Sequence, residues 1–115
     1  MEIQERTFEL AIRIVKLCQY LDKKPGVKRI LSNQMLRSGT SIGANIQEAQ
    51  AGQSRADFLS KMSIASKEAR ETLYWLKLLE KTELISTDRL RHLKQEADEI
   101  VRILTSIVKT TKKNG

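Results

Sequence analysis

The chain is poor in residues that interrupt helices, with one proline, at position 25, and five glycines among 115 residues. Such scarcity favours long helices over many short strands. No run of about 18 apolar residues occurs, so we expect no transmembrane helix. The first residues, Met-Glu-Ile-Gln-Glu-Arg, lack the basic start and the apolar run of a signal peptide. These absences predict an all-α protein that does not associate with a membrane.

Cysteine and histidine are equally scarce, because Cys18 and His92 are the sole examples. A single cysteine excludes an intrachain disulfide, and one residue of each kind excludes a structural zinc site. The acids that a metal could use in a bundle are Glu48, Glu68 and Glu71. The Glu-x-x-His pattern of di-iron bundles is missing, so we expect these acids to pair with Arg37 or other basic residues. The sequence predicts no metal, no cofactor and a location in the reducing cytoplasm.

Apolar residues recur at helical spacing over four segments of the chain. We predict helices at about residues 3–21, 27–51, 55–81 and 87–110. The links between them are short, which makes helices adjacent in sequence antiparallel neighbours in space. Ser54 is expected to cap the third helix and Ser86 or Thr87 the fourth, and the tail from Lys112 is expected to fray. The predicted fold is a single domain, residues 1–115, forming an antiparallel up-down four-helix bundle.

The first helix has more apolar surface than one core contact requires. At 100° per residue its apolar side chains span roughly 220°, about twice the stripe that a surface helix needs. One line of them comprises Phe8, Ala11, Ile12, Val15 and Cys18, and a second comprises Ile3, Leu10, Ile14, Leu17 and Leu21. The excess predicts two burial surfaces, one facing the bundle and one facing something else.

The second helix contains a segment, residues 37–52, that is nearly free of charge: Glu48 is the only charged residue between Arg37 and Arg55. Gly39 and Gly43 each cost a helix interior about 1 kcal/mol relative to alanine. Close approach of another helix would offset that cost, and a helix broken near Gly39 is the alternative. The back of this helix is also uncharged. We therefore predict a subunit interface that comprises Ile14, Leu17, Thr40, Gly43 and Gln47.

A line of small polar residues follows the edge of the same segment. Its members are Ser38, Ser41, Asn45 and Glu48, with Arg37 beside them. A nucleophilic serine needs a base to accept its proton, and nothing in the sequence places His92 near these serines. We interpret the line as a hydrogen-bonded packing seam between helices. No residue is predicted to be catalytic, and we do not expect an enzyme.

The net charge of +7 and the pI near 9.8 favour an anionic partner such as nucleic acid. A basic stripe on the fourth helix comprises Arg91, Lys94, Arg102, Lys109 and Lys113. Such a stripe can neutralise phosphates, although Asp98 interrupts it and an ordinary solvated face is the alternative. The aromatic residues Tyr20, Tyr74 and Trp75 do not interleave with basic residues in this interpretation.

The pattern in residues 34–49 is unusual for a generic bundle. It comprises Gln34-Met35-Leu36-Arg37-Ser38, Ser41-Ile42, Asn45-Ile46 and Glu48-Ala49. It resembles the bacterial four-helix-bundle family named for proteins encoded in 23S rRNA intervening sequences, which is also similar to the accessory variability proteins of diversity-generating retroelements. The resemblance continues through Phe58, Ala65, Ser66, Glu68, Glu71 and Tyr74-Trp75-Leu76.

This resemblance implies an up-down four-helix bundle that assembles as a homopentameric ring and has no known enzymatic activity. The retroelement relatives bind nucleic acid and a reverse transcriptase through a basic surface, whereas this chain is only modestly basic. Our leading hypothesis is a non-enzymatic homo-oligomer that binds RNA or DNA through basic surface on the assembled ring. The alternative is a structural or adaptor oligomer that binds another protein.

Overall fold

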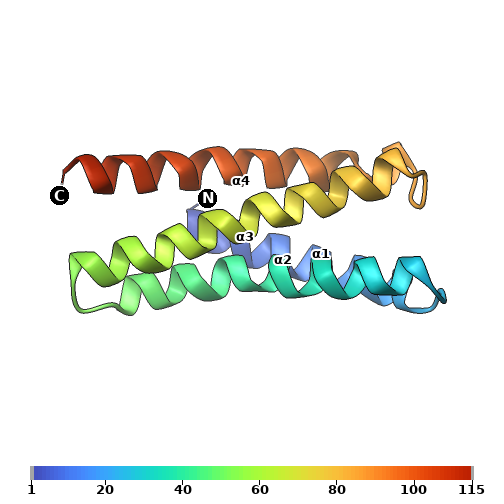
Figure 1. Cartoon of the computed structure of the whole chain (residues 1–115), viewed down its shortest axis with the longest axis horizontal. Helices are drawn as coiled ribbons and strands as arrows, with labels where there is room; N and C mark the ends of the chain where they lie inside the picture. The colour runs from blue at the N-terminus through green and yellow to red at the C-terminus, as the bar shows by residue number, and fades with distance from the viewer. Residues whose placement is uncertain (1, 115) are drawn as a thin grey trace.

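The computed structural model describes residues 2–114 and consists of four long helices. They are α1 (Ile3–Asp22), α2 (Val27–Ala51), α3 (Arg55–Lys81) and α4 (Thr87–Lys113). Successive helices run in opposite directions, as Figure 1 shows, and no strand occurs among the described residues. The result is an elongated four-helix bundle that measures 46 × 23 × 20 Å. No helix within residues 2–114 is long and apolar enough to cross a membrane.

Capping residues in the sequence set the starts of α3 and α4. Ser54 Oγ accepts a hydrogen bond from the backbone N–H of Asp57 at 3.1 Å, and Ser86 Oγ accepts one from the N–H of Arg89 at 3.3 Å. Each bond satisfies a backbone donor that the first turn of a helix leaves free. Gly26 precedes α2 with φ of +79°, a conformation that favours glycine. The two serine caps therefore lie where they were expected.

The end of the chain differs from the prediction. Fraying was expected from Lys112, but α4 continues to Lys113 and Asn114 caps it. Basic side chains in the last turn are favourable there, because the free carbonyl groups make the C-terminal end of a helix partly negative. Residue 115 lies outside the described part of the chain. Helix α1 also ends one residue later than expected, at Asp22.

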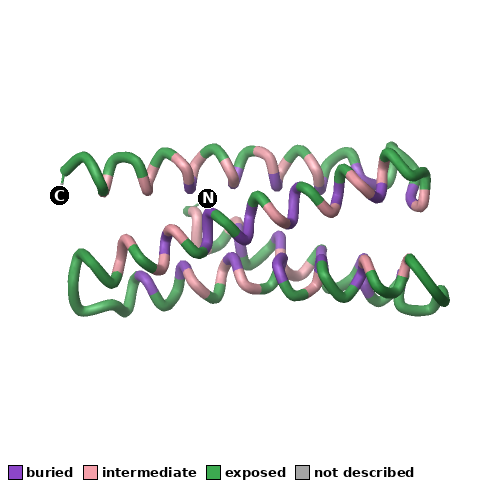
Figure 2. The backbone as a smooth tube through the Cα atoms, viewed as in Figure 1, coloured by how far each residue is buried: buried purple, intermediate pink, exposed green. Residues whose placement is uncertain are grey.

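The core runs along the inner faces of all four helices, and Figure 2 shows the buried positions turned toward one another. On α4 the buried residues alternate at spacings of three and four: Leu90, Leu93, Ala97, Ile100 and Leu104. This seam is typical of helices that pack about 20° from antiparallel. On α1 the buried apolar residues are Leu10, Ile14, Leu17, Cys18 and Leu21.

The structure corrects part of the predicted subunit interface. Ile14 has no exposed surface and Leu17 retains 9%, because both face the core of their own bundle. They cannot offer a contact surface to a second copy. The other apolar line of α1 is more exposed: Phe8 is 58% exposed and Val15 37%, whereas Ala11 and Ile12 are half-buried and Cys18 is buried.

Helix α2 is continuous through Gly39, so the alternative of a broken helix is wrong. A Cβ built on Gly39 would lie 2.8 Å from Cγ2 of Ile14, closer than real Cβ atoms come to any neighbour. A Cβ on Gly43 would lie 3.3 Å from Oγ1 of Thr7. Close helix approach at these glycines was expected, and it occurs between α1 and α2 of the same chain.

Helix α4 packs extensively on α3 and only lightly on α1. Arg6 links α1 to α4, because it binds Glu96 at 2.6 and 3.1 Å and Glu99 at 3.1 Å. In Figure 1 α1 begins short of the end of the bundle at which α4 finishes, so the last turns of α4 extend past it. Arg55, at the start of α3, donates to the carbonyl of Thr111 at 3.1 Å in those turns. The C-terminal part of α4 is therefore held by α3.

Candidate nucleic-acid interface

Arg37 forms an ion-pair cluster with two acids of α3. Its Nη1 lies 3.0 Å from Oε2 of Glu68, and its Nη2 binds Glu71. The hydrogen bond from Arg37 lowers the pKa of the Glu71 carboxyl, and the same bond raises the pKa of the guanidinium. The expected pairing is confirmed for these two acids. It is wrong for Glu48, which is exposed and has no ion pair within residues 2–114.

Ser38 lies at the centre of the predicted packing seam. It is fully buried and accepts a hydrogen bond from Thr72 Oγ1 of α3 at 2.9 Å. Asn45, half-buried one turn beyond Ser41, donates to the hydroxyl and the carbonyl of Ser41 at 2.9 Å. His92 is exposed on α4, a helix that does not contact α2 along its described length. The arrangement gives Ser38 no proton acceptor of the kind that nucleophilic catalysis needs.

No group of three or more His, Cys, Asp or Glu side chains within residues 2–114 is placed to hold a metal ion. Of the three acids that a metal could have used, Glu68 is 6% exposed and held by Arg37. The pKa of Glu71 is lowered mainly by Arg37, with smaller contributions from Trp75 and Lys67. The indole Nε1 of Trp75 is buried and has no hydrogen-bond partner among residues 2–114.

The predicted basic stripe of α4 is on the surface, but acids offset part of its charge. Arg91 pairs with Asp88 at 2.6 Å, and Arg102 pairs with Asp98 at 3.1 Å. Lys94 is half-buried and reaches α3, where its Nζ lies 2.6 Å from Oε1 of Glu80. Lys109 and Lys113 are exposed and form no ion pair with residues 2–114. Two of the five predicted cations therefore carry an unopposed charge.

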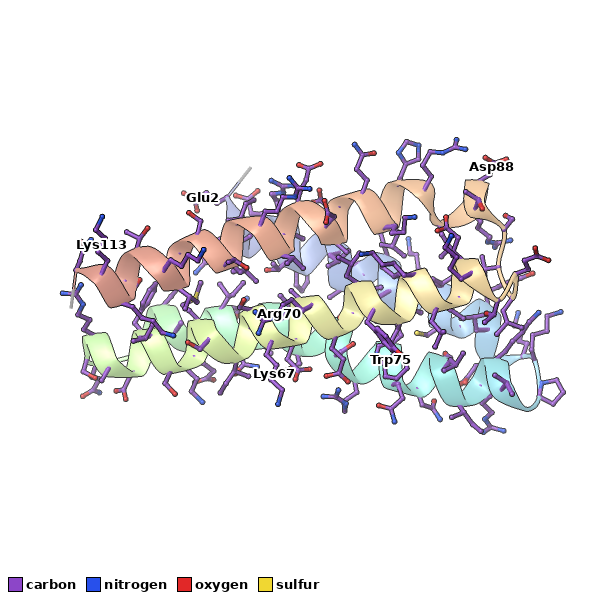
Figure 3. The ribbon with its side chains drawn as sticks, turned by 45° about the horizontal axis from the view of Figure 1, so that its top comes forward. Glu2, Lys67, Arg70, Trp75, Asp88 and Lys113 are labelled. Carbon is purple, nitrogen blue, oxygen red and sulfur yellow. The ribbon has the colours of Figure 1, made fainter. Side chains whose placement is uncertain are left out.

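A second basic stripe lies on α3, where sequence reasoning did not place one. Its members are Lys67, Arg70, Tyr74, Lys77 and Lys81, and all five are exposed. Lys67 and Arg70 project from α3 in Figure 3 with no helix drawn over them. None of its four cations forms an ion pair within residues 2–114, and no acid interrupts the stripe. The signal was readable in the sequence, because the members alternate at spacings of three and four.

The α3 stripe also corrects the interpretation of the aromatic residues. Tyr74 is 58% exposed and lies between two basic residues on either side along the stripe. It therefore does interleave with basic residues. Lys94 of the α4 stripe reaches α3 at Glu80, the residue that precedes Lys81.

A different surface lies between α1 and α2. An open groove of about 320 Å³ is lined by Gln4, Phe8, Ala11, Thr40, Gly43, Ala44 and Gln47. None of these side chains is charged, although 30% of the residues of the chain are. Three members of the predicted subunit interface, Thr40, Gly43 and Gln47, thus line one groove with the exposed ring of Phe8.

Comparison with known proteins places the fold in a family. Residues 1–106 match the 23S rRNA-intervening sequence protein family. The chain belongs to this family. No match was found among curated proteins.

A solved structure of a related protein is similar to this member of the 23S rRNA-intervening sequence protein family. It is a crystal structure of a protein of unknown function from the S23 ribosomal protein family of Bacteroides thetaiotaomicron. The two sequences are 46% identical, and the match covers 94% of this chain and 99% of the other with a TM-score of 0.86. The four-helix bundle is therefore shared at close sequence similarity.

In this 23S rRNA-intervening sequence protein, the motif that carried the resemblance has a structural role. Ser38 is buried against Thr72, and Arg37 holds Glu68 and Glu71 against α2. These contacts fix the packing of α2 on α3, the most extensive helix pair of the bundle. The two basic stripes and the uncharged α1–α2 groove lie outside these contacts and remain exposed in large part.

Proposed function

We propose that this 23S rRNA-intervening sequence protein is a non-enzymatic, cytoplasmic homo-oligomer that binds nucleic acid through the basic surface of α3 and α4. The observation that carries the proposal is the α3 stripe, because its four exposed cations have no acidic partner among the described residues. Unpaired cations can exchange their counterions for phosphate groups, which is the main source of affinity in non-specific nucleic-acid binding. The buried free thiol of Cys18 is compatible with a reducing compartment.

The α4 stripe is proposed to contribute less per residue. Arg91 and Arg102 must share their charge with Asp88 and Asp98, which lie one turn away on the same helix. Lys109 and Lys113 extend the surface toward the C-terminal end of the bundle. The α3 cations are thus proposed to contribute more than the paired α4 cations, whereas the sequence analysis named only the α4 stripe.

Fluorescence anisotropy with labelled RNA and DNA, at 50 and 200 mM salt, tests the proposal. Binding should weaken steeply over that interval, because each phosphate contact adds about one unit to the salt slope. The double variant Lys67→Gln/Lys77→Gln should reduce the slope by about two. Arg91→Gln/Arg102→Gln should reduce the slope less, because each of these arginines already pairs with an acid of its own helix and so makes weaker phosphate contacts.

A matched control removes the same charge elsewhere. Lys16 and Lys23 are exposed on α1 and just beyond its end. The variant Lys16→Gln/Lys23→Gln should retain the salt slope of the unsubstituted protein. If the unsubstituted protein does not bind RNA or DNA at micromolar concentration in low salt, the proposal fails.

Self-association is proposed to use the α1–α2 groove. Phe8 stays largely exposed in the single chain, and burying an aromatic ring of this size stabilises an interface substantially. The uncharged rim formed by Thr40, Gly43 and Gln47 carries no desolvation cost of the kind that charged groups impose. Five copies in a ring is the number that the family resemblance implies.

An adaptor that binds another protein remains the second candidate, and the same groove supports it. For that partner the resemblance suggests a reverse transcriptase. Affinity capture with purified tagged protein, with and without nuclease, distinguishes the candidates. Partners that persist after nuclease favour the adaptor, and partners lost with nuclease favour nucleic-acid binding.

A further inference from the structure

We infer that Tyr74 is a base-stacking platform and that the α3 stripe takes single-stranded rather than duplex nucleic acid. The inference rests on the proposed function and specifies the class of nucleic acid that the stripe binds. Three observations support it: the position of Tyr74 among the cations, the exposure of its ring, and the contact that the ring makes with Trp75.

Tyr74 lies at the middle of the α3 stripe. Lys67 and Arg70 precede it by seven and four residues, and Lys77 and Lys81 follow it by three and seven. At 1.5 Å per residue the stripe is about 20 Å long. A strand that follows the stripe would have phosphates near cations on both sides of the ring. Proteins that bind single strands without sequence preference commonly combine a basic track with an aromatic ring in this way.

The ring of Tyr74 is available, unlike that of the other tyrosine. Tyr20 is covered by two cations, with the guanidinium of Arg89 at 4.0 Å and the Nζ of Lys24 at 5.8 Å from the ring centroid. No cation from residues 2–114 lies over Tyr74, which is 58% exposed. The two tyrosines are therefore a natural pair of test and control.

Trp75 supports the ring of Tyr74 from one side. The two rings meet edge to face, with centroids 5.2 Å apart and planes at 74°. Trp75 is itself half-buried and packs against the core. This contact restricts the motion of Tyr74, so less conformational entropy is lost when a base stacks on it.

Stacking distinguishes single strands from duplexes. In a duplex the faces of the bases are already covered by their neighbours, and a ring on a helix surface can reach only the phosphate backbone. In a single strand each base can present a free face. The cations should therefore bind both forms, whereas Tyr74 should add affinity for the single strand alone.

The test measures binding of the full chain at 50 mM salt to two labelled probes. One is an unpaired 20-nucleotide RNA made of adenine and cytosine, and the other is the same RNA annealed to its complement. Parallel DNA probes should show the same dependence on Tyr74, because stacking does not involve the sugar. The unsubstituted protein should bind the single strand more tightly than the duplex.

Tyr74→Ala should weaken single-strand binding by about 5- to 150-fold, the range that corresponds to loss of one stacked base. It should leave duplex binding unchanged. Tyr74→Phe should retain single-strand affinity, and Tyr20→Ala should leave both affinities as they are. Because Tyr74 is mainly exposed, each variant should keep the helical circular dichroism of the parent.

The outcomes separate this inference from the proposed function. Equal affinity of Tyr74→Ala and the parent for the single strand would overturn the stacking role and leave nucleic-acid binding in place. Equal loss for single strand and duplex would also overturn it, because the change would then lie in the charged surface. Failure of the parent to bind any probe would overturn both proposals.

Discussion

The Cβ that Gly39 lacks would lie 2.8 Å from Cγ2 of Ile14. Cγ1 and Cβ of the same isoleucine would lie at 3.1 and 3.3 Å. Ile14 is fully buried, so it has no room in which to move away. The absence of a side chain at Gly39 therefore allows α1 and α2 to approach this closely.

Gly39→Ala should destabilise the bundle although alanine is the better helix former. The propensity gain is about 1 kcal/mol. Forcing a methyl group against a packed side chain typically costs about 1–3 kcal/mol. We expect a net loss of roughly 1 kcal/mol in urea unfolding, monitored by circular dichroism at one protein concentration. In an Ile14→Ala background the clash is gone and Gly39→Ala should stabilise. The same effect in both backgrounds would contradict the steric explanation.

Gly43→Ala is the matched glycine substitution. Its Cβ would meet Thr7 Oγ1 at 3.3 Å, a contact that a shift of a few tenths of an ångström relieves. The helix propensity gain of up to about 1 kcal/mol should then exceed the steric cost, so stability should be unchanged or slightly higher. A loss as large as that of Gly39→Ala would show that the α1–α2 contact is equally tight along its length.

The link between Arg6 and Glu96 should make stability depend on pH. The hydrogen bond from Arg6 lowers the pKa of the Glu96 carboxyl in the folded state. Its contribution is thus present above the unfolded pKa of about 4.3 and is lost as pH falls through the lower folded value. Arg6→Gln should cost roughly 1 kcal/mol at pH 7. The difference from the parent should shrink toward zero below pH 4, as urea unfolding at several pH values would show.

Arg102→Gln is the control for this ion pair. Arg102 and Asp98 are one turn apart and largely exposed, a geometry that contributes about 0.3–0.5 kcal/mol. Its effect on unfolding should therefore be small. If Arg102→Gln cost as much as Arg6→Gln, the link between α1 and α4 would have no special role.

If copies of the chain associate through the α1–α2 groove, substitutions in that groove should weaken self-association. Phe8→Gln removes the exposed ring, and Gln47→Arg adds a charge to the uncharged lining of the groove. Both variants should shift the protein toward monomer in light scattering at tens of micromolar. The control Gln95→Arg adds the same charge to an exposed position of α4 and should leave the mass unchanged. A parent protein that is already monomeric would remove the interface proposal.

Substitutions of Ser38, which is buried against Thr72, should change the stability of the bundle. Ser38→Ala should cost about 1 kcal/mol or less, because Thr72 Oγ1 also lies 2.9 Å from the carbonyl of Glu68 and stays satisfied. Ser38→Leu should cost more, since Ser38 is fully buried and the seam leaves no space for a larger side chain. Thermal unfolding of the two variants measures the difference. A larger loss for alanine than for leucine would contradict the packing interpretation.

Features that depend on neighbours along the chain were predictable. Helix starts follow from capping residues such as Ser54, and the core seam of α4 follows from its spacing of three and four. The pairing of Arg37 with Glu68 and Glu71 was expected as well, but it joins residues of two helices and therefore depends on how α2 packs on α3. The unbroken course of α2 followed from the argument that a second helix would offset the cost of its glycines.

Features that depend on the direction of a neighbouring helix were not predictable. The two apolar lines of α1 are equivalent in sequence, and only the position of α2 shows that Ile14 is inside and Phe8 outside. The α4 stripe was regular in sequence, but Lys94 turned out to be paired across to Glu80 on α3. The α3 stripe was readable from its spacing, but only the structure shows that its cations form no ion pair within residues 2–114.

The amino-acid sequence by itself determined that this protein forms four long helices and where they begin, because caps and apolar periodicity act within a few residues. The tertiary structure alone decided which surfaces remain free. Glu68, Glu71 and Glu80 are engaged by Arg37 and Lys94, and the cations of the α3 stripe around Tyr74 form no ion pair within residues 2–114. The physical reason is that an ion pair between helices depends on their mutual rotation, and packing of the whole core sets that rotation.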